Sequence, residues 1–254
     1  NKGGIKLLCD IAKPKIGVIT GVNEQHLATF GSMENLLSAE GGEELIESLP
    51  KDGTAFFNAK NKYCRDLYEK TPIKKFLYAE NAEFLGEENL LGAAAVAKEL
   101  GMTNGEISVV IEKIENKLPG IQKKTGVNNL TILNASYSAN PTGVIAHLEY
   151  LSRFSGKKII IMPCLIELGK ASKEVHQKIG EKIGEICDLA IITTKDRFKE
   201  LKDGFLSAGG KEENILFREA AGKIFEKIKE FSKPDDIVLL EGRVPGELIK
   251  LLVK

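Results

Sequence analysis

The feature that most constrains the fold is a regular alternation of short apolar segments with longer amphipathic ones from about residue 130 onward. Some of the apolar segments are uninterrupted, as in residues 159–161 (Ile-Ile-Ile) and 190–192 (Ala-Ile-Ile). Strands of this kind are buried on both faces, which is typical of a parallel sheet covered by helices. Because parallel crossovers are right-handed, the pattern predicts a doubly wound, Rossmann-like α/β domain.

Element positions follow from this periodicity and from turn residues. The strands of the regular series are predicted at 130–133, 158–162, 189–193, 214–217 and 237–240. The helices that alternate with them are predicted at 141–154, 172–186, 196–208, 219–231 and 245–253.

The earlier part of the chain carries a less regular version of the same pattern. Strands are predicted at 16–20 and 54–58. Helices are predicted at 32–49, with Ser32 as the N-cap, at 87–100 and at 105–117. The segment 116–129 contains Pro119-Gly120 and is the best candidate for a linker.

Composition gives no support to some classes of function. Lys plus Arg and Asp plus Glu each number 36, so the net charge is zero and gives no support to binding of nucleic acid or of a membrane surface. No apolar run reaches the length of about 18 residues that a membrane span needs. The four cysteines form no Cys-x-x-Cys pair, which favours free thiols in the reducing cytoplasm over a metal or redox site.

Candidate ligand sites follow from the predicted topology. Ligands of open α/β sheets bind beyond the carboxyl ends of the strands. The polar segments that follow predicted strands are 21–26, 134–141, 163–169 and 241–243. None contains the Gly-x-x-x-x-Gly-Lys-Ser/Thr loop that cradles phosphates, because the nearest approach, 164–171, has Cys164 for the first glycine and Ala171 for the hydroxyl residue.

The histidines leave alternatives open. His26 follows a strand and a polar turn, so it could bind a metal or a ligand or simply lie on the surface. His147 and His176 fall within predicted helices, where packing is the expected role. Spacing alone reveals no nucleophile–base set.

An ordered series of motifs resembles the Mur ligase family. Residues 18–32 end in His26-Leu-Ala-Thr-Phe-Gly-Ser32, similar to the family's His-Leu-x-x-Phe-Gly-Ser. Residues 86–89 resemble its Gly-x-His-Asn motif, and residues 136–141 its Ser-Tyr-Asn-Ala-Asn-Pro motif. Glu167-Leu-Gly169 with His176 and Gly180, and then Gly242-Arg243, resemble later motifs, so the resemblance covers nearly the whole chain.

The resemblance implies a domain organisation and a reaction. Residues 1–118 would be the second half of the central ATPase domain and residues 119–254 the C-terminal Rossmann-like domain, with the N-terminal half of the ligase missing. ATP would phosphorylate a UDP-muramoyl peptide, and an amino acid or dipeptide such as D-alanyl-D-alanine would attack the acyl phosphate, with Mg²⁺ stabilising the charge.

The resemblance also assigns residue roles. His26 and Glu167 would be catalytic, with His26 also near the metal. The residues that would contact substrate are Ser136, His176 and Arg243. Those that would contact the nucleotide are Asn23, Asn89, Asn134, Tyr137, Asn140 and Pro141.

Several positions depart from the family's pattern. The carbamoylated lysine of the family would fall near Gly42, and the motif histidine is replaced by Glu88. Ile121 stands where an arginine usually follows Pro-Gly, and Asn134 or Ala135 stands for the aspartate before Ser-Tyr. These losses favour an alternative in which the chain is a non-catalytic relative that binds a nucleotide or a partner. An unrelated Rossmann-like binding domain is the third hypothesis.

Overall fold

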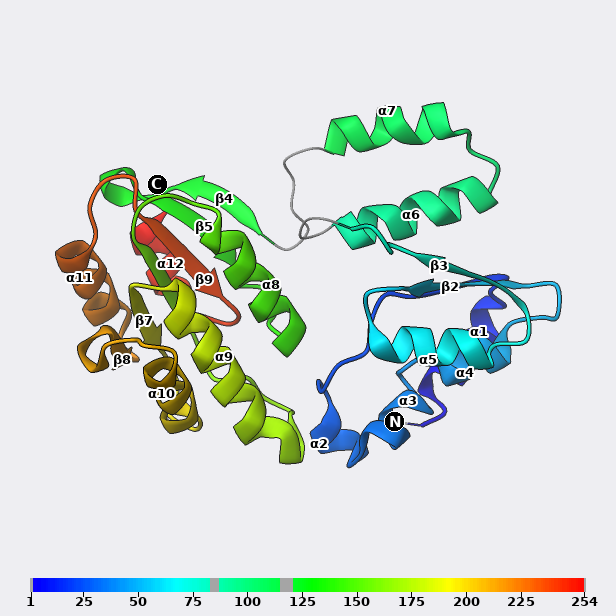
Figure 1. Ribbon diagram of the computed structural model, residues 1–254, viewed down its shortest axis with the longest axis horizontal. Coiled ribbons are helices and arrows are strands. Elements are labelled where there is room, and N and C mark those ends of the chain that lie inside the picture. The colour runs from blue at the N-terminus through cyan, green and yellow to red at the C-terminus, as the bar shows by residue number, and fades with distance from the viewer. Residues whose placement is uncertain (1, 83–86, 115–120, 254) are drawn as a thin grey trace. The chain divides into compact units, whose positions relative to one another are not determined.

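The structure is a computed structural model that describes residues 2–82, 87–114 and 121–253 (Figure 1). By its internal contacts the chain divides into two compact units, Asn1–Asn116 and Lys117–Lys254, which are described separately. The predicted boundary between residues 118 and 119 lies outside the described residues.

The first unit is built on a small parallel sheet in the order β1-β2-β3. Its strands are β1 (Ile16–Ile19), β2 (Thr54–Asn58) and β3 (Lys74–Tyr78). Its helices are α1 (Gly4–Ala12), α2 (Leu27–Phe30), α3 (Met33–Leu37), α4 (Glu43–Ser48), α5 (Lys62–Lys70), α6 (Glu87–Glu99) and α7 (Asn104–Ile114).

The central strand β2 separates two apolar clusters. Phe57 packs with Ile19 and Leu67 on the side of α4 and α5. Phe56 packs with Tyr78 on the other side, against α6. The strand is therefore buried along its whole length, as its apolar sequence predicts.

The predicted helix 32–49 is wrong in one respect, because it is two helices. Ser32 caps α3 as expected, its hydroxyl accepting a hydrogen bond from the backbone of Asn35 at 3.2 Å. The backbone then turns through Gly41 and Gly42, and Gly42 has a φ of 114° before α4 begins. A residue with this φ cannot continue a right-handed helix.

The second unit is a doubly wound α/β domain, which confirms the predicted fold class. Its sheet has the order β4-β5-β9-β6-β7-β8, with β4 antiparallel to β5 and the other pairs parallel. The strands are β4 (Gln122–Thr125), β5 (Thr131–Ala135), β6 (Lys158–Met162), β7 (Leu189–Ile192), β8 (Ile215–Phe217) and β9 (Ile237–Glu241).

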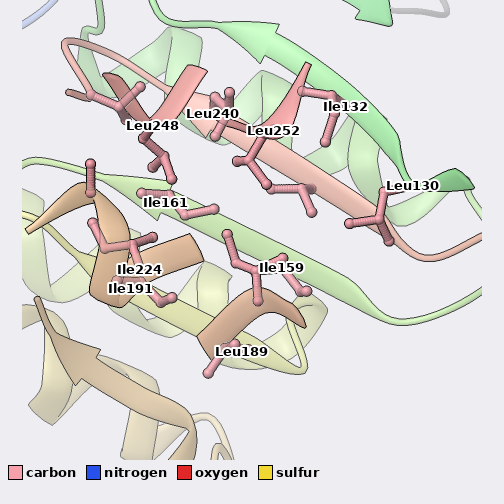
Figure 2. Close-up of a cluster of buried hydrophobic side chains, with 14 residues drawn as sticks. Leu130, Ile132, Ile159, Ile161, Leu189, Ile191, Ile224, Leu240, Leu248 and Leu252 are labelled. Carbon is pink, nitrogen blue, oxygen red and sulfur yellow. The ribbon is translucent and has the colours of Figure 1, made fainter. Parts of the chain in front are cut away.

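Helices cover both faces of this sheet (Figure 1). One face packs on α11 (Ala221–Phe231) and α12 (Gly246–Leu252), where Ile224 and Leu248 meet Ile161 and Leu240 of the strands (Figure 2). The helices of the other face are α8 (Pro141–Ser152), α9 (Ser172–Ile186) and α10 (Phe198–Ser207). Short 3-10 turns precede some elements, at η1 (Val127–Asn129), η2 (Gly169–Ala171) and η3 (Glu212–Asn214).

The linker predicted at 116–129 is partly a strand. Residues 122–125 pair with β5 as the edge strand β4, so the described part of this segment belongs to the second unit. The sequence Gln-Lys-Lys-Thr carries charge that suits an edge strand and gives no apolar signal for one.

Candidate functional site

The loop that connects β5 to α8 is held in a defined turn by its own asparagines. Asn134 Oδ1 accepts a hydrogen bond from the backbone N–H of Ser136 at 3.1 Å. Asn140 caps α8, its Oδ1 accepting from the backbone N–H of Gly143 at 2.9 Å, and Pro141 occupies the first helical position. The predicted cofactor contacts Asn134, Asn140 and Pro141 thus shape the loop itself.

The turn after β9 lies against this loop. The backbone N–H of Gly242 donates to the carbonyl of Ala135 at 3.1 Å. Gly242 has a φ of 66°, and a Cβ there would lie 3.0 Å from Cβ of Ala139, so the two segments approach too closely for most side chains. Tyr137, 91% exposed, and the exposed Arg243 stand on these adjoining segments. A ring face and a guanidinium are therefore offered at one edge of the sheet.

The loop after β6 is anchored by His176. The backbone N–H of Leu165 donates to His176 Nε2 at 2.9 Å, and His176 Nδ1 donates to the carbonyl of Ser172 at 2.6 Å. The ring is fully buried, and burial lowers its pKa, so the imidazole is neutral. With both nitrogens engaged inside the chain, His176 fixes the loop, and this geometry offers no ring atom to a substrate.

Glu167 occupies an exposed and strained position in the same loop. Its φ of 64° lies in the left-handed region, which costs a non-glycine residue about 1–2 kcal/mol. The loop is also tied from the other side, because the backbone N–H of Cys164 donates to Thr194 Oγ1 at 2.7 Å. The predicted catalytic carboxylate is therefore presented at the carboxyl end of β6 by a rigid loop.

A buried pair that the sequence analysis did not predict lies between α8 and β9. His147 Nδ1 and Glu241 Oε2 are 2.6 Å apart. Glu241 is fully buried, and its other oxygen, Oε1, has no hydrogen-bond partner among the described residues. Burial raises the pKa of this carboxyl, and the hydrogen bond to His147 opposes that rise. No spacing rule links residues 94 positions apart, so sequence gave no signal for the pair.

In the first unit, the segment after β1 carries the remaining predicted residues. Asn23 Oδ1 accepts from the backbone N–H of Gln25 at 2.9 Å, closing a turn. His26 follows with a φ of 68° immediately before α2 and is partly buried. Asn61 holds the turn to α5, its Nδ2 donating to the carbonyl of Val22 at 2.9 Å.

Glu88 has a structural partner in this unit. The buried Asn58, at the end of β2, donates through Nδ2 to Glu88 Oε2 at 2.6 Å and to the carbonyl of Thr20 at 2.8 Å. The start of α6 is thereby joined to the ends of β1 and β2. Asn89, the predicted cofactor contact, is exposed in the first turn of α6, while Gly86 of the same motif lies outside the described residues.

Two positions of missing family charges are now explained by packing. A Cβ on Gly42 would lie 2.7 Å from Cδ1 of Ile19 and 3.1 Å from Cδ2 of Leu67. With its φ of 114°, this backbone would be strained by a lysine. Ile121 is buried, with 6% of its surface exposed, where an arginine would lose its hydration.

Residues 2–82, 87–114 and 121–253 carry no metal cluster and no membrane span. In this part of the chain no group of three His, Cys, Asp or Glu side chains could hold a metal ion. None of the helices described is both long and apolar enough to span a membrane. All four cysteines are free and buried.

Comparison with known proteins assigns the family. Residues 2–132 match the family model for the Mur ligase middle domain, and residues 121–244 match that for the Mur ligase, glutamate ligase domain. The chain belongs to the Mur ligase family. The resemblance found in the sequence motifs is therefore confirmed for both parts of this Mur ligase chain.

Curated relatives of this Mur ligase chain carry ligase names. It is 25% identical over 293 aligned residues to UDP-N-acetylmuramoyl-tripeptide–D-alanyl-D-alanine ligase of Bacillus subtilis (strain 168), covering 100% of this chain and 62% of that protein. It is 24% identical over 221 residues to the enzyme of the same name from Escherichia coli (strain K12), covering 71% of this chain and 48% of that protein. The chain thus spans less than two thirds of these relatives.

Solved structures show the same fold. The MurF ligase from Thermotoga maritima in complex with ADP matches with a TM-score of 0.79 at 21% identity, covering 99% of this chain and 64% of that one. A MurF structure from Acinetobacter baumannii matches with a TM-score of 0.77 at 19% identity, covering 96% and 60%.

Proposed function

We propose that this Mur ligase chain forms part of an ATP-dependent ligase that joins D-alanyl-D-alanine, or a similar amine substrate, to a UDP-muramoyl peptide. The observation that carries the proposal is that the exposed Tyr137 and the exposed Arg243 stand on two adjoining segments, which follow β5 and β9 and are joined by the Gly242–Ala135 backbone hydrogen bond. The Thermotoga maritima relative was solved with ADP, and the Bacillus subtilis relative is named for the D-alanyl-D-alanine reaction.

The proposed reaction has two steps that balance. The peptide carboxylate attacks the γ-phosphorus of ATP, which releases ADP and forms an acyl phosphate. The amine of the incoming substrate then attacks the acyl carbon, forming the amide bond and releasing inorganic phosphate and a proton. Such chemistry depends on positioned groups that offset the charge of the phosphate oxygens.

In this proposal the second unit supplies both nucleotide and substrate contacts. Tyr137 offers its ring face to the base, within the loop that Asn134, Asn140 and Pro141 shape. Arg243 and Ser136 are assigned to anionic groups of the substrates, and Glu167 to the reacting amine. His176 acts through the loop that it anchors.

The first unit would contribute Asn23 and Asn89 to the nucleotide and His26 to the metal side. Mg²⁺ would offset the phosphate charge when bound with ATP. Because the described residues hold no three-ligand cluster, we assign most of its contacts to phosphate and water, with His26 as the protein candidate.

The proposal requires a phosphate-binding loop from outside these residues. The sequence contains no Gly-x-x-x-x-Gly-Lys-Ser/Thr, and the chain covers 62% of the Bacillus subtilis protein. We therefore propose that the remaining part of the ligase supplies this loop and the UDP-sugar contacts. The use of ATP and a UDP-linked substrate, together with four buried free thiols, favours the cytoplasm as the site of action.

Two experiments test the function. In the first, ADP with Mg²⁺ is titrated into the ¹⁵N-labelled chain, and the amides of 134–140 and 242–243 should shift with weak affinity. Arg243→Ala should abolish or weaken these shifts, while Glu149→Gln, an exposed change on α8, should not. Absence of any shift at these amides would contradict the proposed nucleotide contacts.

The second experiment uses the whole ligase that carries this chain. Release of ADP should require both a UDP-muramoyl peptide and an amine substrate, with D-alanyl-D-alanine tested against single amino acids. ATP hydrolysis that does not depend on the amine, or the absence of turnover with every amine tested, would favour the second candidate function, which is described next.

That second candidate is a non-catalytic Mur-like protein that binds a nucleotide or a partner. The observations favouring it are that Gly42 has no room for the family's lysine and that Glu88 is engaged with Asn58. Both positions contribute to the local packing of the first unit, whereas the family has a lysine and a histidine there that are directed at the ligand. Binding of ADP by the whole protein without amine-dependent turnover would support this reading.

A further inference from the structure

The His147–Glu241 pair is a largely buried hydrogen-bonded contact that joins α8 to the ligand edge of the sheet in the second unit. Glu241 ends β9, directly before the Gly242–Arg243 turn. His147 lies on α8, which begins at the Asn140 cap. The 2.6 Å contact between them therefore connects the two segments that carry Tyr137 and Arg243.

We propose that His147 and Glu241 are positioning residues: they form a buried clasp that fixes the 134–141 loop against the 242–243 turn and so sets the ligand edge. This inference rests on the proposed function, because it deepens the role of that edge. A pair that served packing alone would be costly here, since a buried carboxyl group with one oxygen unpartnered among the described residues is worse for stability than an apolar side chain of similar volume.

The local backbone contacts show what the clasp would hold. Gly242 N–H bonds to the carbonyl of Ala135 at 3.1 Å, and Ala135 is also the register partner of Glu241. A shift of α8 away from β9 would carry the Asn140 cap with it and open this approach. The clasp therefore holds the loop at the end that leads into α8, while the Gly242–Ala135 bond holds it at the end that follows β5.

Among the described residues, His147 is the ionisable neighbour that acts on the Glu241 carboxyl, through a hydrogen bond and through its charge. The other ionisable groups of the adjoining elements lie away from this contact: Glu149 of α8 is exposed, Lys158 is at the opposite end of β6, and Arg243 after β9 is exposed. The protonation of Glu241 should therefore affect the strength of the clasp.

The sign of the pH effect follows. Burial raises the pKa of Glu241 above its ordinary value of 4.5, so the carboxyl holds its proton more tightly in the folded chain than in the unfolded one. The stability that this group contributes is present below pH 4.5 and is lost as pH rises through the folded pKa. The loop should accordingly loosen as the medium becomes more alkaline.

The clasp is tested by amide hydrogen exchange in the full chain without nucleotide, corrected for the intrinsic pH dependence of exchange. In His147→Ala, protection of the Gly143, Ser136 and Gly242 amides should fall by about tenfold or more, while that of the β6 and β7 amides stays unchanged. Glu149→Gln, on the same helix, should leave all of them unchanged. Unaltered protection in His147→Ala, or an equal loss throughout the unit, would overturn the clasp.

The isosteric variant Glu241→Gln keeps the size and shape of the side chain but cannot ionise. It therefore separates the effect of the charge from the effect of packing. As the pH rises above 4.5 and passes the raised pKa of Glu241, the wild-type chain should lose protection at these amides, and Glu241→Gln should not. Parallel pH profiles in the two proteins would overturn the role of the Glu241 carboxyl proton.

Measurement of nucleotide affinity tests the positioning role. Titration of ADP with Mg²⁺ should give an affinity about tenfold weaker in His147→Ala than in the wild type or in Glu149→Gln. Equal affinities in the three proteins would overturn the positioning role. The hydrogen-exchange experiment uses no nucleotide, so unaltered protection in His147→Ala would overturn the clasp alone. A wild-type chain whose amides do not shift on addition of ADP with Mg²⁺ would contradict the proposed function alone.

Discussion

The backbone N–H of Leu165 donates a hydrogen bond of 2.9 Å to Nε2 of His176, which lies eleven residues further along the chain on α9. This bond holds the loop that presents Glu167. His176→Ala would leave the Leu165 N–H buried without a partner and would open a cavity, so we expect a loss of about 2–4 kcal/mol in the free energy of unfolding. Urea denaturation measures it, with Lys178→Ala, an exposed change on the same helix, expected to stay within about 0.5 kcal/mol.

The same histidine makes stability depend on pH. Burial lowers the pKa of His176 below its ordinary value of 6.5, so between these values the unfolded chain binds a proton that the folded chain does not. The stability that this group contributes is therefore present above pH 6.5 and is lost as pH falls through the folded pKa. The difference between wild type and His176→Ala in urea unfolding should shrink as the pH is lowered below 6.5. Parallel stability profiles would show that the ring is not buried as a neutral imidazole.

Gly180 is required by the contact between α9 and α10. A Cβ at this position would lie 2.2 Å from the carbonyl oxygen of Leu201, which is backbone and cannot move aside alone. Gly180→Ala should therefore force the helices apart and cost about 2–4 kcal/mol. Gly222→Ala is the matched control, because nothing lies within 4 Å of a Cβ there and a helical alanine should be neutral or stabilising by up to about 1 kcal/mol. Similar thermal stability for the two variants would contradict the contact.

How far the sequence predicts the second unit can be seen in α9 and β6. Helix 172–186 and strand 158–162 were both predicted at their observed bounds, because their apolar periodicity is strong and their ends carry turn residues. Strand β4 was missed, since Gln-Lys-Lys-Thr has no apolar signal and its pairing depends on β5. Elements with a strong apolar pattern can therefore be predicted from sequence, whereas a polar edge strand that is defined only by its pairing cannot.

The candidate site divides in the same way. The cap at Ser32 follows from residue type and position and was predicted, whereas Asn140 was assigned to the nucleotide and its role as the cap of α8 came from the structure. The His147–Glu241 pair depends on a tertiary contact that no spacing encodes. Three elements of the first unit, α1, α5 and β3, were not predicted, because their composition is mixed. Strand β3, for example, begins with Lys74-Lys75.

A lysine introduced at position 42 should lower the stability of the first unit. Gly42→Lys would place a side chain on a backbone with a φ of 114° and against Ile19, so we expect a loss of about 2–4 kcal/mol in the first unit. Gly105→Ala is the control in the same unit, at a helical position with nothing within 4 Å of the added Cβ. Chemical denaturation followed at Tyr63 and Tyr68, which pack in the cluster around Ile19, reports on this region. If Gly42→Lys were as stable as Gly105→Ala, position 42 could accept the family's lysine and the packing argument would fail.

The two units should behave differently when each is expressed alone. Residues 119–254 contain a sheet with both faces covered and a contiguous core, so this fragment should unfold cooperatively as a monomer. In the first unit, α1 exposes Leu7, Leu8 and Ile11 at 61%, 60% and 74%, and β1 is an outer strand of the described sheet. Such a surface favours association, so residues 1–118 should show concentration-dependent self-association in sedimentation velocity.

The cause of that association can be assigned by substitution. Leu8→Glu with Ile11→Lys should reduce it if α1 forms the contact, because the charges would have to be desolvated on association. Val109→Lys, a single change on α7 at a residue that is 50% exposed, should leave it in place. A fragment that stays monomeric at every concentration would mean that the α1 surface and the β1 edge do not drive assembly. Equal relief of association by the α1 and α7 variants would mean that net charge, and not this surface, controls it.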